Sequence, residues 1–315
     1  MLDLVIVGGS AAGLSASIYA ARRNLNFKII SDNLGGEVAM SGVVGNWPGI
    51  ININGVELAQ KMIDHVKSFK VDIEQGWKIV KIAQEKNHHV LTAQNSAGEE
   101  KTYKAKSVII ATGIHPRKLN IPGEKEFLHK GITYCTVCDG PLFKNKITTT
   151  VGSGNSALES ALMMSKIAKK VYVLSKFPNT PEMNGGFRRA EKVLIEAVKS
   201  TPNVEILYSA LAQEIVGDKV VNELKYKDEN GEIKTIETQG VMVHIGNIPN
   251  SDFVDCASKD PLGQIIVNNK CQTDCTGIFS AGDVTDLPYK QIIIASGQGV
   301  IAALSAIEYI NRWKE

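Results

Sequence analysis

A chain of 315 residues is long for one domain, and its 43% hydrophobic and 22% charged residues are typical of a globular enzyme. The formal net charge of +2 gives no electrostatic reason to expect nucleic acid or a membrane as a partner. No uninterrupted apolar run has the length of a transmembrane helix, and residues 1–10 are too short and too acidic for a signal peptide. The five cysteines are too sparse for a secreted disulfide framework, so we expect a cytoplasmic protein.

The opening of the chain has the pattern of a nucleotide-binding unit. Leu2–Val7 is predicted to be a strand, a glycine-rich turn follows, and Leu14–Arg23 has the apolar spacing of a helix. In this order the elements place a pyrophosphate at the helix N-terminus, although an ordinary βα turn is the alternative. Phe27–Ile30 is the next predicted strand, and Ser31 and Asp32 end it where a ribose-binding carboxylate is expected. The turn consists of Gly8, Gly9, Ser10, Ala11, Ala12 and Gly13.

The segments that follow alternate between turn formers and short periodic runs. Loops are predicted at Gly35–Glu37 and Asn46–Gly49, and Asn54–Phe69 is predicted to be an amphipathic helix. Strands are predicted near Trp77–Ile82, His89–Thr92 and Ser107–Ala111. We expect His88 and His89 to begin their strand in solvent.

The strand–glycine–helix pattern restarts near the middle of the chain. Ile147–Val151 is the predicted strand, the helix runs to about Ile167, and Val171–Leu174 is the next strand. Two such signatures in one chain predict two nucleotides, one that delivers reducing equivalents and one that receives them. A loop is expected at Asn179–Gly186 and a helix near Phe187–Val198. The second turn contains Gly152, Gly154, Asn155, Ser156 and Ala157.

The last third of the chain returns to the first unit. His115–Pro116 and Gly246–Pro249 are the predicted crossovers, Gly277–Asp283 is a short strand into a glycine turn, and a final helix ends near Ile310. The fold class is therefore predicted as α/β, with two Rossmann-like three-layer dinucleotide-binding domains, the second inserted into the first. The predicted domains are residues 1–114 with 247–315, and residues 115–246.

Between the two signatures lies a pair of cysteines, in Cys135-Thr136-Val137-Cys138-Asp139-Gly140. Two cysteines separated by two residues can close a small reducible disulfide, and such a segment lowers the pKa of one thiol. Asp139 could carry a proton to or from the leaving thiolate. The alternative is a zinc site shared with Cys271 and Cys275, which are spaced C-x₃-C. We expect Cys256, Cys271 and Cys275 to be inert or lightly exposed thiols otherwise.

Several short motifs, in one order, carry a family resemblance. They are GGSAAG followed by IYAARR, then GNWPG, ATG, CTVCDG, GSGNSALES, IGNIPN, GIFSAGDV and YKQ. Across nearly its whole length the chain resembles the low-molecular-weight thioredoxin reductases, a class of FAD-dependent pyridine nucleotide-disulfide oxidoreductases. The resemblance implies an FAD domain formed by both chain ends, an inserted pyridine-nucleotide domain, a homodimer, and thioredoxin or a glutaredoxin-like protein as the partner.

The resemblance also assigns roles to residues. Cys138 would face the flavin, Cys135 would attack the partner disulfide, and Asp139 would be the acid and base. The first glycine turn would hold the FAD pyrophosphate, and Asp283 would bond the ribityl chain. The remaining FAD positions would be Ser31, Asp32, Gly36, Glu37, Asn46, Thr112, Gly113, Gly282, Lys290, Gln291 and Ile292.

The chain departs from the family where the donor would bind. NADPH-using members have a His-Arg-Arg cluster after the second strand of the inserted domain, and this chain has Ser175-Lys176-Phe177-Pro178. Lys176 could supply one charge, and the segment with Arg188 and Arg189 could stand in, after a short insertion, for the further arginine that follows the cluster in the family. The donor therefore stays open among NADPH, NADH, a reduced deazaflavin and ferredoxin.

Two further interpretations of the whole protein stay open. One is a reductase that feeds a peroxiredoxin. Such enzymes usually carry an extra N-terminal redox domain, whereas Met1 stands at the first FAD strand here. The other is a flavin-binding regulatory protein whose donor site has decayed.

Overall fold

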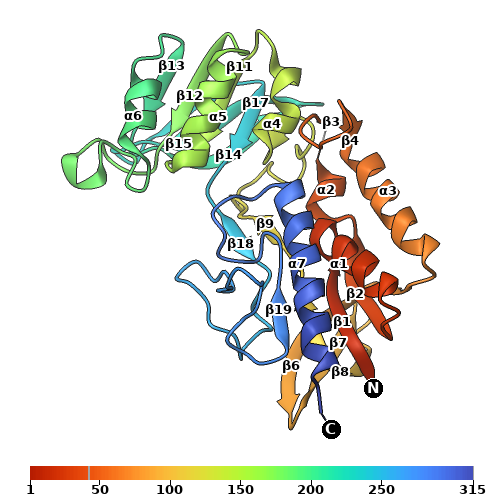
Figure 1. The fold of residues 1–315 in the computed structure, drawn as a ribbon. Helices are drawn as coiled ribbons and strands as arrows, with labels where there is room; N and C mark the ends of the chain where they lie inside the picture. The colour runs from red at the N-terminus through yellow and green to blue at the C-terminus, as the bar shows by residue number, and fades with distance from the viewer. Residues whose placement is uncertain (42, 315) are drawn as a thin grey trace. The chain divides into compact units, whose positions relative to one another are not determined.

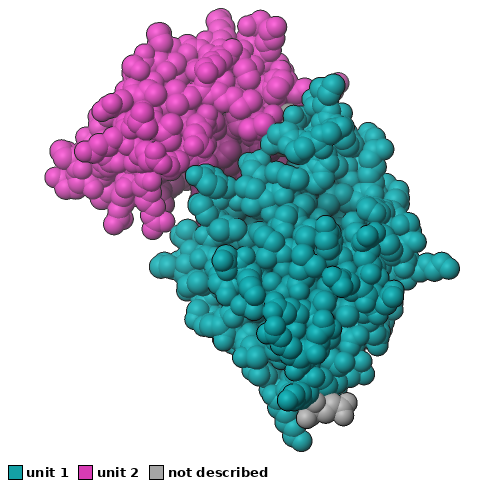
Figure 2. All heavy atoms as spheres, viewed as in Figure 1, with its two compact units in different colours: residues 1–115, 248–315 teal, residues 116–247 magenta. Residues whose placement is uncertain are grey.

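The computed structural model describes residues 1–41 and 43–314, with the side chain of Cys138 outside the described part. The chain forms two compact units (Figure 2). Unit 1 contains residues 1–115 and 248–315, and unit 2 contains residues 116–247. These limits lie one residue from the predicted domain boundaries, while the nucleotide assigned to each domain stays a prediction.

Unit 1 is built on a seven-stranded sheet (Figure 1). Its strands are β1 (Leu2–Gly9), β2 (Phe27–Leu34), β5 (Asp72–Gln75), β6 (Trp77–Glu85), β7 (His88–Asn95), β8 (Glu100–Ile110) and β19 (Ile278–Ser280). The order is β5-β2-β1-β8-β7-β6, and β19 pairs with the last residues of β8. The strands β5, β2, β1, β8 and β19 pair in parallel, whereas β6, β7 and β8 form an antiparallel meander.

Helices cover one face of this sheet. They are α1 (Ala11–Arg22), α2 (Gly36–Met40), α3 (Gly55–Ser68) and α7 (Ile292–Asn311), and a small ribbon of β3 (Val43–Val44) and β4 (Ile53–Asn54) joins α2 to α3. Because strand side chains alternate, Leu4 and Ile6 pack under α1, α3 and α7, while Val5 and Val7 face the meander and the loop before β19. Figure 1 shows α7 along α1, although the two helices are far apart in sequence.

Helix α7 is apolar as well as long. Among the described residues it is the one helix with the length and composition to cross a membrane. Half of its most apolar window is buried inside the protein, as in the core helix of a globular domain. Ala302, Ala303 and Ala306 supply part of that buried side.

Unit 2 repeats the βα plan with a second layer of strands. The parallel sheet has the order β10 (Ile132–Thr133), β17 (Gly240–Val243), β11 (Ile147–Val151), β12 (Lys170–Leu174) and β13 (Val204–Leu207). One core packs this sheet against α5 (Asn155–Ser165) and α6 (Lys192–Lys199), and another packs it against the antiparallel sheet of β14 (Leu211–Gly217), β15 (Val221–Lys227) and β16 (Ile233–Glu237). The short elements are α4 (Thr136–Asp139), η1 (Gly140–Phe143), η2 (Pro181–Met183), β9 (Ile114–Pro116) and β18 (Asn247–Pro249).

These elements confirm the predicted α/β class and correct some local predictions. The predicted loop at Gly35–Glu37 is wrong, because Glu37 lies in α2. The helix predicted from Phe187 begins only at Lys192, because Phe187 is fully buried in the loop that precedes the helix. His89 is 1% exposed rather than solvated, because it shares the inner face of β7 with Leu91 and Ala93.

The edge of the unit 1 sheet contains a charge cluster that predicts a pH effect on stability. Glu74 accepts hydrogen bonds from Lys28 Nζ (2.7 Å), Tyr103 Oη (2.6 Å) and Lys101 Nζ (3.1 Å). Burial opposes its ionisation, but these donors outweigh burial and lower the pKa of Glu74 from 4.5 to about 2. A lowered folded-state pKa contributes stability above the unfolded-state pKa and loses it as pH falls toward the folded-state pKa.

We therefore expect Glu74→Gln to lower the free energy of unfolding by about 3 kcal/mol at pH 7. The difference from wild type should shrink as pH falls below about 4.5. Denaturant unfolding of both proteins from pH 7 to pH 3 measures it. Glu57→Gln is the matched control, because Glu57 is 60% exposed and pairs with Lys61 at 3.5 Å. A difference that does not depend on pH would show that the charge of Glu74 is unimportant.

Candidate active site

The turn between β1 and α1 is closed so tightly that two positions admit only glycine. A Cβ on Gly13 would lie 1.9 Å from the Gly8 carbonyl oxygen, and a Cβ on Gly8 would lie 2.3 Å from the Ala111 carbonyl oxygen. Gly8 also has a φ of +115°, which side-chain-bearing residues rarely adopt. The helical ladder starts with the Leu14 N–H donating to the Ser10 carbonyl (2.8 Å). The amides before it are the ones that bind a pyrophosphate in such turns, so this turn fits FAD.

Other predicted FAD residues gather around this turn within unit 1. The Ser10 hydroxyl donates to the Gly35 carbonyl (2.7 Å), which joins the turn to α2. Asn46 Nδ2 donates to Gln291 Oε1 (3.0 Å), just before Ile292 begins α7. Gly282 lies against α1, since a Cβ there would be 3.0 Å from Ala12 Cβ.

The crossover residues Thr112 and Gly113 are held by Asn250, which the sequence analysis did not single out. The Thr112 hydroxyl donates to the Asn250 carbonyl (2.6 Å), and Asn250 Nδ2 donates to the Thr112 carbonyl (2.9 Å). The Asn250 N–H donates to the Gly113 carbonyl (3.0 Å), and its Oδ1 lies 2.7 Å from His115 Nδ1. The signal was present in the last residue of the IGNIPN motif, because an asparagine side chain can both donate to and accept from nearby backbone groups.

Three charged groups meet beside α2 and the start of α7. Burial raises the pKa of Glu37, and Asp283 adds to this effect while His115 opposes it. Burial also raises the pKa of Asp283 and lowers that of Lys290, whose ammonium donates to the Thr285 carbonyl (2.6 Å). Asp283 and Lys290 are partly buried whereas Glu37 is exposed, and partly buried charges such as Asp283 and Lys290 favour a polar ligand that would satisfy them.

Ser31 and Asp32 do not end their strand as predicted, because β2 continues to Leu34. Ser31 is buried, and its hydroxyl donates to the Asn33 carbonyl (2.5 Å). Asp32 is exposed, so its carboxylate can reach a ribose, and this role stays a prediction.

The second glycine turn lies between β11 and α5 in unit 2. A Cβ on Gly152 would lie 2.1 Å from the His244 carbonyl oxygen, whereas a Cβ on Gly154 would meet no atom within 4 Å. The open side at Gly154 leaves room for a phosphate at the N-terminus of α5. Asn155 exchanges two hydrogen bonds of 2.9 Å with Glu191, Ser156 is exposed, and Ala157 is buried.

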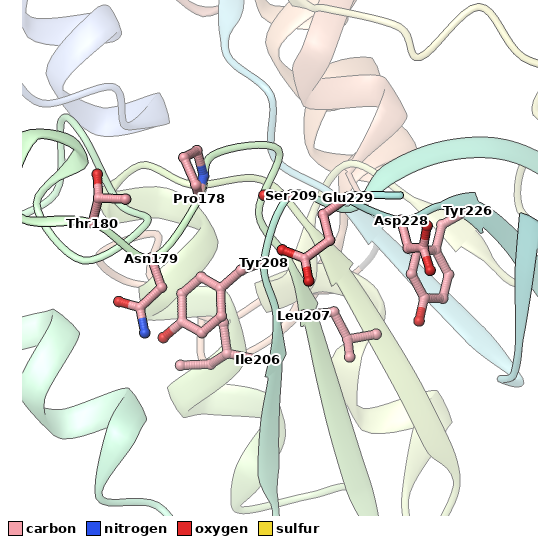
Figure 3. A pocket seen from close by; sticks show the side chains of 10 residues that line it. All are labelled: Pro178, Asn179, Thr180, Ile206, Leu207, Tyr208, Ser209, Tyr226, Asp228 and Glu229. Atoms are coloured by element: carbon pink, nitrogen blue, oxygen red, sulfur yellow. The ribbon is translucent and has the colours of Figure 1, made fainter. Parts of the chain in front are cut away.

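A groove opens beside the ends of β12 and β13, with a cavity volume of about 480 Å³. Figure 3 shows Tyr208 between the loop residues Asn179 and Thr180 on one side and Glu229 on the other. The described residues that line it are Pro178, Asn179, Thr180, Ile206, Leu207, Tyr208, Ser209, Tyr226, Asp228 and Glu229. These residues include two carboxylates and no lysine or arginine, so the groove suits hydroxyl groups better than a phosphate.

The three cations proposed for a 2′-phosphate are not part of that lining. Lys176, Arg188 and Arg189 are all exposed. Lys176 Nζ lies over the ring of Phe177, 5.2 Å from its centre. Ser175 is buried, and its hydroxyl donates to the Gly186 carbonyl.

The cysteine motif begins where β10 ends, and Cys135 is disulfide-bonded. The Thr133 hydroxyl accepts from the Cys135 N–H (3.0 Å) and donates to Asp139 Oδ2 (2.6 Å). The Asp139 N–H in turn donates to the Cys135 carbonyl (3.1 Å). Cys138 lies in α4, its side chain is outside the described residues, and its pairing with Cys135 stays a prediction.

Helix α4 is anchored from its first residue. The Thr136 hydroxyl lies 2.7 Å from His244 Nε2 and 2.6 Å from Ser160 Oγ on α5. Burial lowers the pKa of His244 to about 4, so this imidazole is neutral at pH 7. This link between His244 and the cysteine motif was not predicted, because the two are far apart in sequence.

The cysteines of the zinc alternative lie in unit 1. Cys271 and Cys275 are buried in two different hydrophobic clusters, and both are free thiols.

Two dinucleotide-type βα turns and a disulfide-bonded cysteine beside a carboxylate define a flavin-dependent disulfide oxidoreductase. A model of the pyridine nucleotide-disulphide oxidoreductase family matches residues 2–299. The chain belongs to this family, whose members use FAD and a pyridine nucleotide.

Three relatives illustrate the likeness. An alkyl hydroperoxide reductase subunit of Escherichia coli K12 is 38% identical over 319 residues, which cover 99% of this chain and 59% of that protein. NADH dehydrogenase of Bacillus subtilis 168 is 38% identical over 312 residues, which cover 98% and 59%. The crystal structure of thioredoxin reductase from Streptococcus pyogenes MGAS5005 has a TM-score of 0.81 and 31% identity, with 99% of each chain covered. The chain thus spans about three fifths of the length of the curated relatives it matches.

Proposed function

We propose that this protein carries electrons from a reduced pyridine nucleotide through FAD to a Cys135–Cys138 disulfide, and from there to a small dithiol protein. Bound FAD would accept two electrons from the donor and pass them on. The observation that carries the proposal is the disulfide-bonded Cys135, joined through the Thr133 hydroxyl to the Asp139 carboxylate.

Each residue of the cysteine motif would have its own role in disulfide exchange. The Cys135 thiolate would attack one sulfur of the partner disulfide and form a mixed disulfide. Attack by the second thiol would then release the partner as a dithiol. Asp139, held by Thr133, would take up and return the proton on the thiols.

Thioredoxin or a glutaredoxin-like protein is the proposed partner, because the Streptococcus pyogenes neighbour is a thioredoxin reductase. A peroxidase partner is the second candidate, since the Escherichia coli relative at 38% identity belongs to an alkyl hydroperoxide reductase. Anaerobic titration of the yellow protein with NADH or NADPH, followed by assays with thioredoxin, a glutaredoxin and a peroxiredoxin, tests the proposal. Flavin that is reduced by neither nucleotide would exclude them as donors and direct the search to deazaflavin or ferredoxin.

We propose NADH rather than NADPH as the donor. The site after β12 offers one lysine, and the groove beside it carries Asp228 and Glu229, which would repel a 2′-phosphate. We therefore expect a higher kcat/KM for NADH, unchanged when Lys176, Arg188 and Arg189 are all replaced by alanine. A strong preference for NADPH that this triple variant erases would contradict the assignment.

Thr133 is a positioning residue in this proposal, and Thr133→Val tests it. Valine keeps the volume but leaves the Cys135 N–H and the Asp139 carboxylate without the hydroxyl. We expect partner reduction to fall about 10- to 100-fold, with an altered pH profile, while flavin reduction by the donor is unchanged. Thr133→Ser should restore the rate. If serine and valine behave alike, the hydroxyl has no part in positioning the carboxylate.

A cytoplasmic homodimer completes the proposal. Helix α7 exposes Ile293, Ile301 and Leu304, which a second copy would cover. Light scattering on the purified protein tests the dimer, and a monomer at micromolar concentration would contradict it.

A further inference from the structure

A second pair of cysteines lies in unit 1, outside the proposed redox motif. Cys256 is exposed, Cys275 is 6% exposed, and both are free thiols. Each of these two thiols shifts the pKa of the other, so the two side chains lie near each other.

The surrounding segments hold the two cysteines near each other. The Ser258 N–H donates to Asp274 Oδ1 (2.9 Å), and the Ser258 hydroxyl donates to the other carboxylate oxygen. Val254 and Ala257 are buried in the same hydrophobic cluster as Cys275. These contacts fix the segments that carry Cys256 and Cys275 against each other, an arrangement that favours a bond between their sulfurs.

The two thiols are chemically unequal. The interaction with Cys275 lowers the pKa of Cys256, and the same interaction together with burial raises the pKa of Cys275. Asp255 and Asp274 oppose ionisation of Cys256 but do not outweigh this interaction. The exposed sulfur is thus the nucleophile, and the buried sulfur keeps its proton.

We propose that Cys256 and Cys275 are a peroxide-oxidised thiol pair that closes an intramolecular disulfide independently of Cys135. The Cys256 thiolate attacks hydrogen peroxide, the O–O bond breaks, and the departing hydroxide takes a proton and leaves as water. The sulfur of Cys275 then attacks the sulfenic acid sulfur of Cys256. The S–O bond breaks, and the hydroxyl leaves as water with the Cys275 proton. Two thiols and one peroxide give one disulfide and two waters.

The test treats the purified protein with one equivalent of hydrogen peroxide and maps disulfides by mass spectrometry after a non-reducing tryptic digest. We expect a cross-link between the peptide that contains Cys256 and the peptide of residues 271–290. That second peptide also contains Cys271, so the digest is repeated on Cys271→Ser. Cys271 is buried, and its thiol donates to the Gln298 carbonyl (3.6 Å), so the cross-link should persist in this variant.

Single substitutions test separately the role of Cys256 as the nucleophile and the role of Cys275 as the thiol that closes the disulfide. Cys275→Ser should accumulate a sulfenic acid at Cys256 that dimedone traps, and Cys256→Ser should leave Cys275 unmodified. A dithiol should reverse the cross-link in wild type. The proposal is overturned if peroxide gives only intermolecular disulfides or sulfonic acid at Cys256, or if the cross-link disappears in Cys271→Ser.

Discussion

Replacing Cys135 with serine is expected to abolish reduction of the partner disulfide, by about 10³-fold or more, and to leave a flavin that the donor still reduces. A serine hydroxyl is not ionised at neutral pH and does not attack a disulfide. The fold should survive, because Cys135 is only partly buried and its N–H and carbonyl contacts do not need the sulfur. Anaerobic stopped-flow spectroscopy measures flavin reduction, and a coupled thioredoxin assay measures turnover.

Cys256→Ser is the matched control, because it removes an exposed thiol that has no place in the proposed electron path. Its turnover under anaerobic conditions should equal that of wild type. Partner reduction by Cys135→Ser at the wild-type rate would mean that another thiol attacks the partner, and Cys138→Ser would then be the variant to examine.

The Gly13→Ala variant is expected to lose bound FAD and to give much less folded protein than wild type. The new methyl carbon would lie 1.9 Å from the Gly8 carbonyl oxygen, and a backbone atom cannot move aside as a flexible side chain can. The helix would have to separate from β1, at a cost of about 3 kcal/mol or more. The same separation would displace the amides that are proposed to bind the pyrophosphate.

The flavin-to-protein ratio and the thermal midpoint of the purified variant measure this effect. Gly297→Ala is the matched control, because Gly297 lies in α7 and a Cβ there meets no atom within 4 Å. Alanine is also the better helix former, so this variant should be as stable as wild type or slightly more stable. A Gly13→Ala protein with full flavin content would show that the turn is looser than the structure indicates.

The parts of the fold that could be predicted are those that neighbouring residues in the sequence determine. Both glycine turns were found because close strand–helix packing excludes a side chain, and Ile147–Val151 was predicted at its observed limits. His89 could also have been placed correctly, since it alternates in phase with Leu91 and Ala93. The prediction for His89 was wrong because the polarity of histidine was given more weight than its position in the alternating pattern of the strand.

Other features could not be predicted, because they depend on residues that are distant in the sequence. Phe187 stops α6 from starting early because it is buried against Tyr208, which lies after the next strand. Thr133, Thr136 and Asn250 matter because of partners that folding brings to them, and a hydroxyl or amide in a sequence does not indicate its partner. The cysteine motif was found by spacing, but the threonine that positions its carboxylate was not.

The pairing of β19 with β8 also determines the order in which the two units can fold during synthesis. Strand β8 lies between β1 and β19, and α1 packs under α7, yet β19 and α7 follow all of unit 2 along the chain. Ribosomes add ~5–20 residues per second, so unit 2 is free to fold on the order of seconds before unit 1 can be completed. During that interval the nascent chain exposes an unpaired stretch of β8 and the apolar side of α1, which is where we expect a chaperone to bind it.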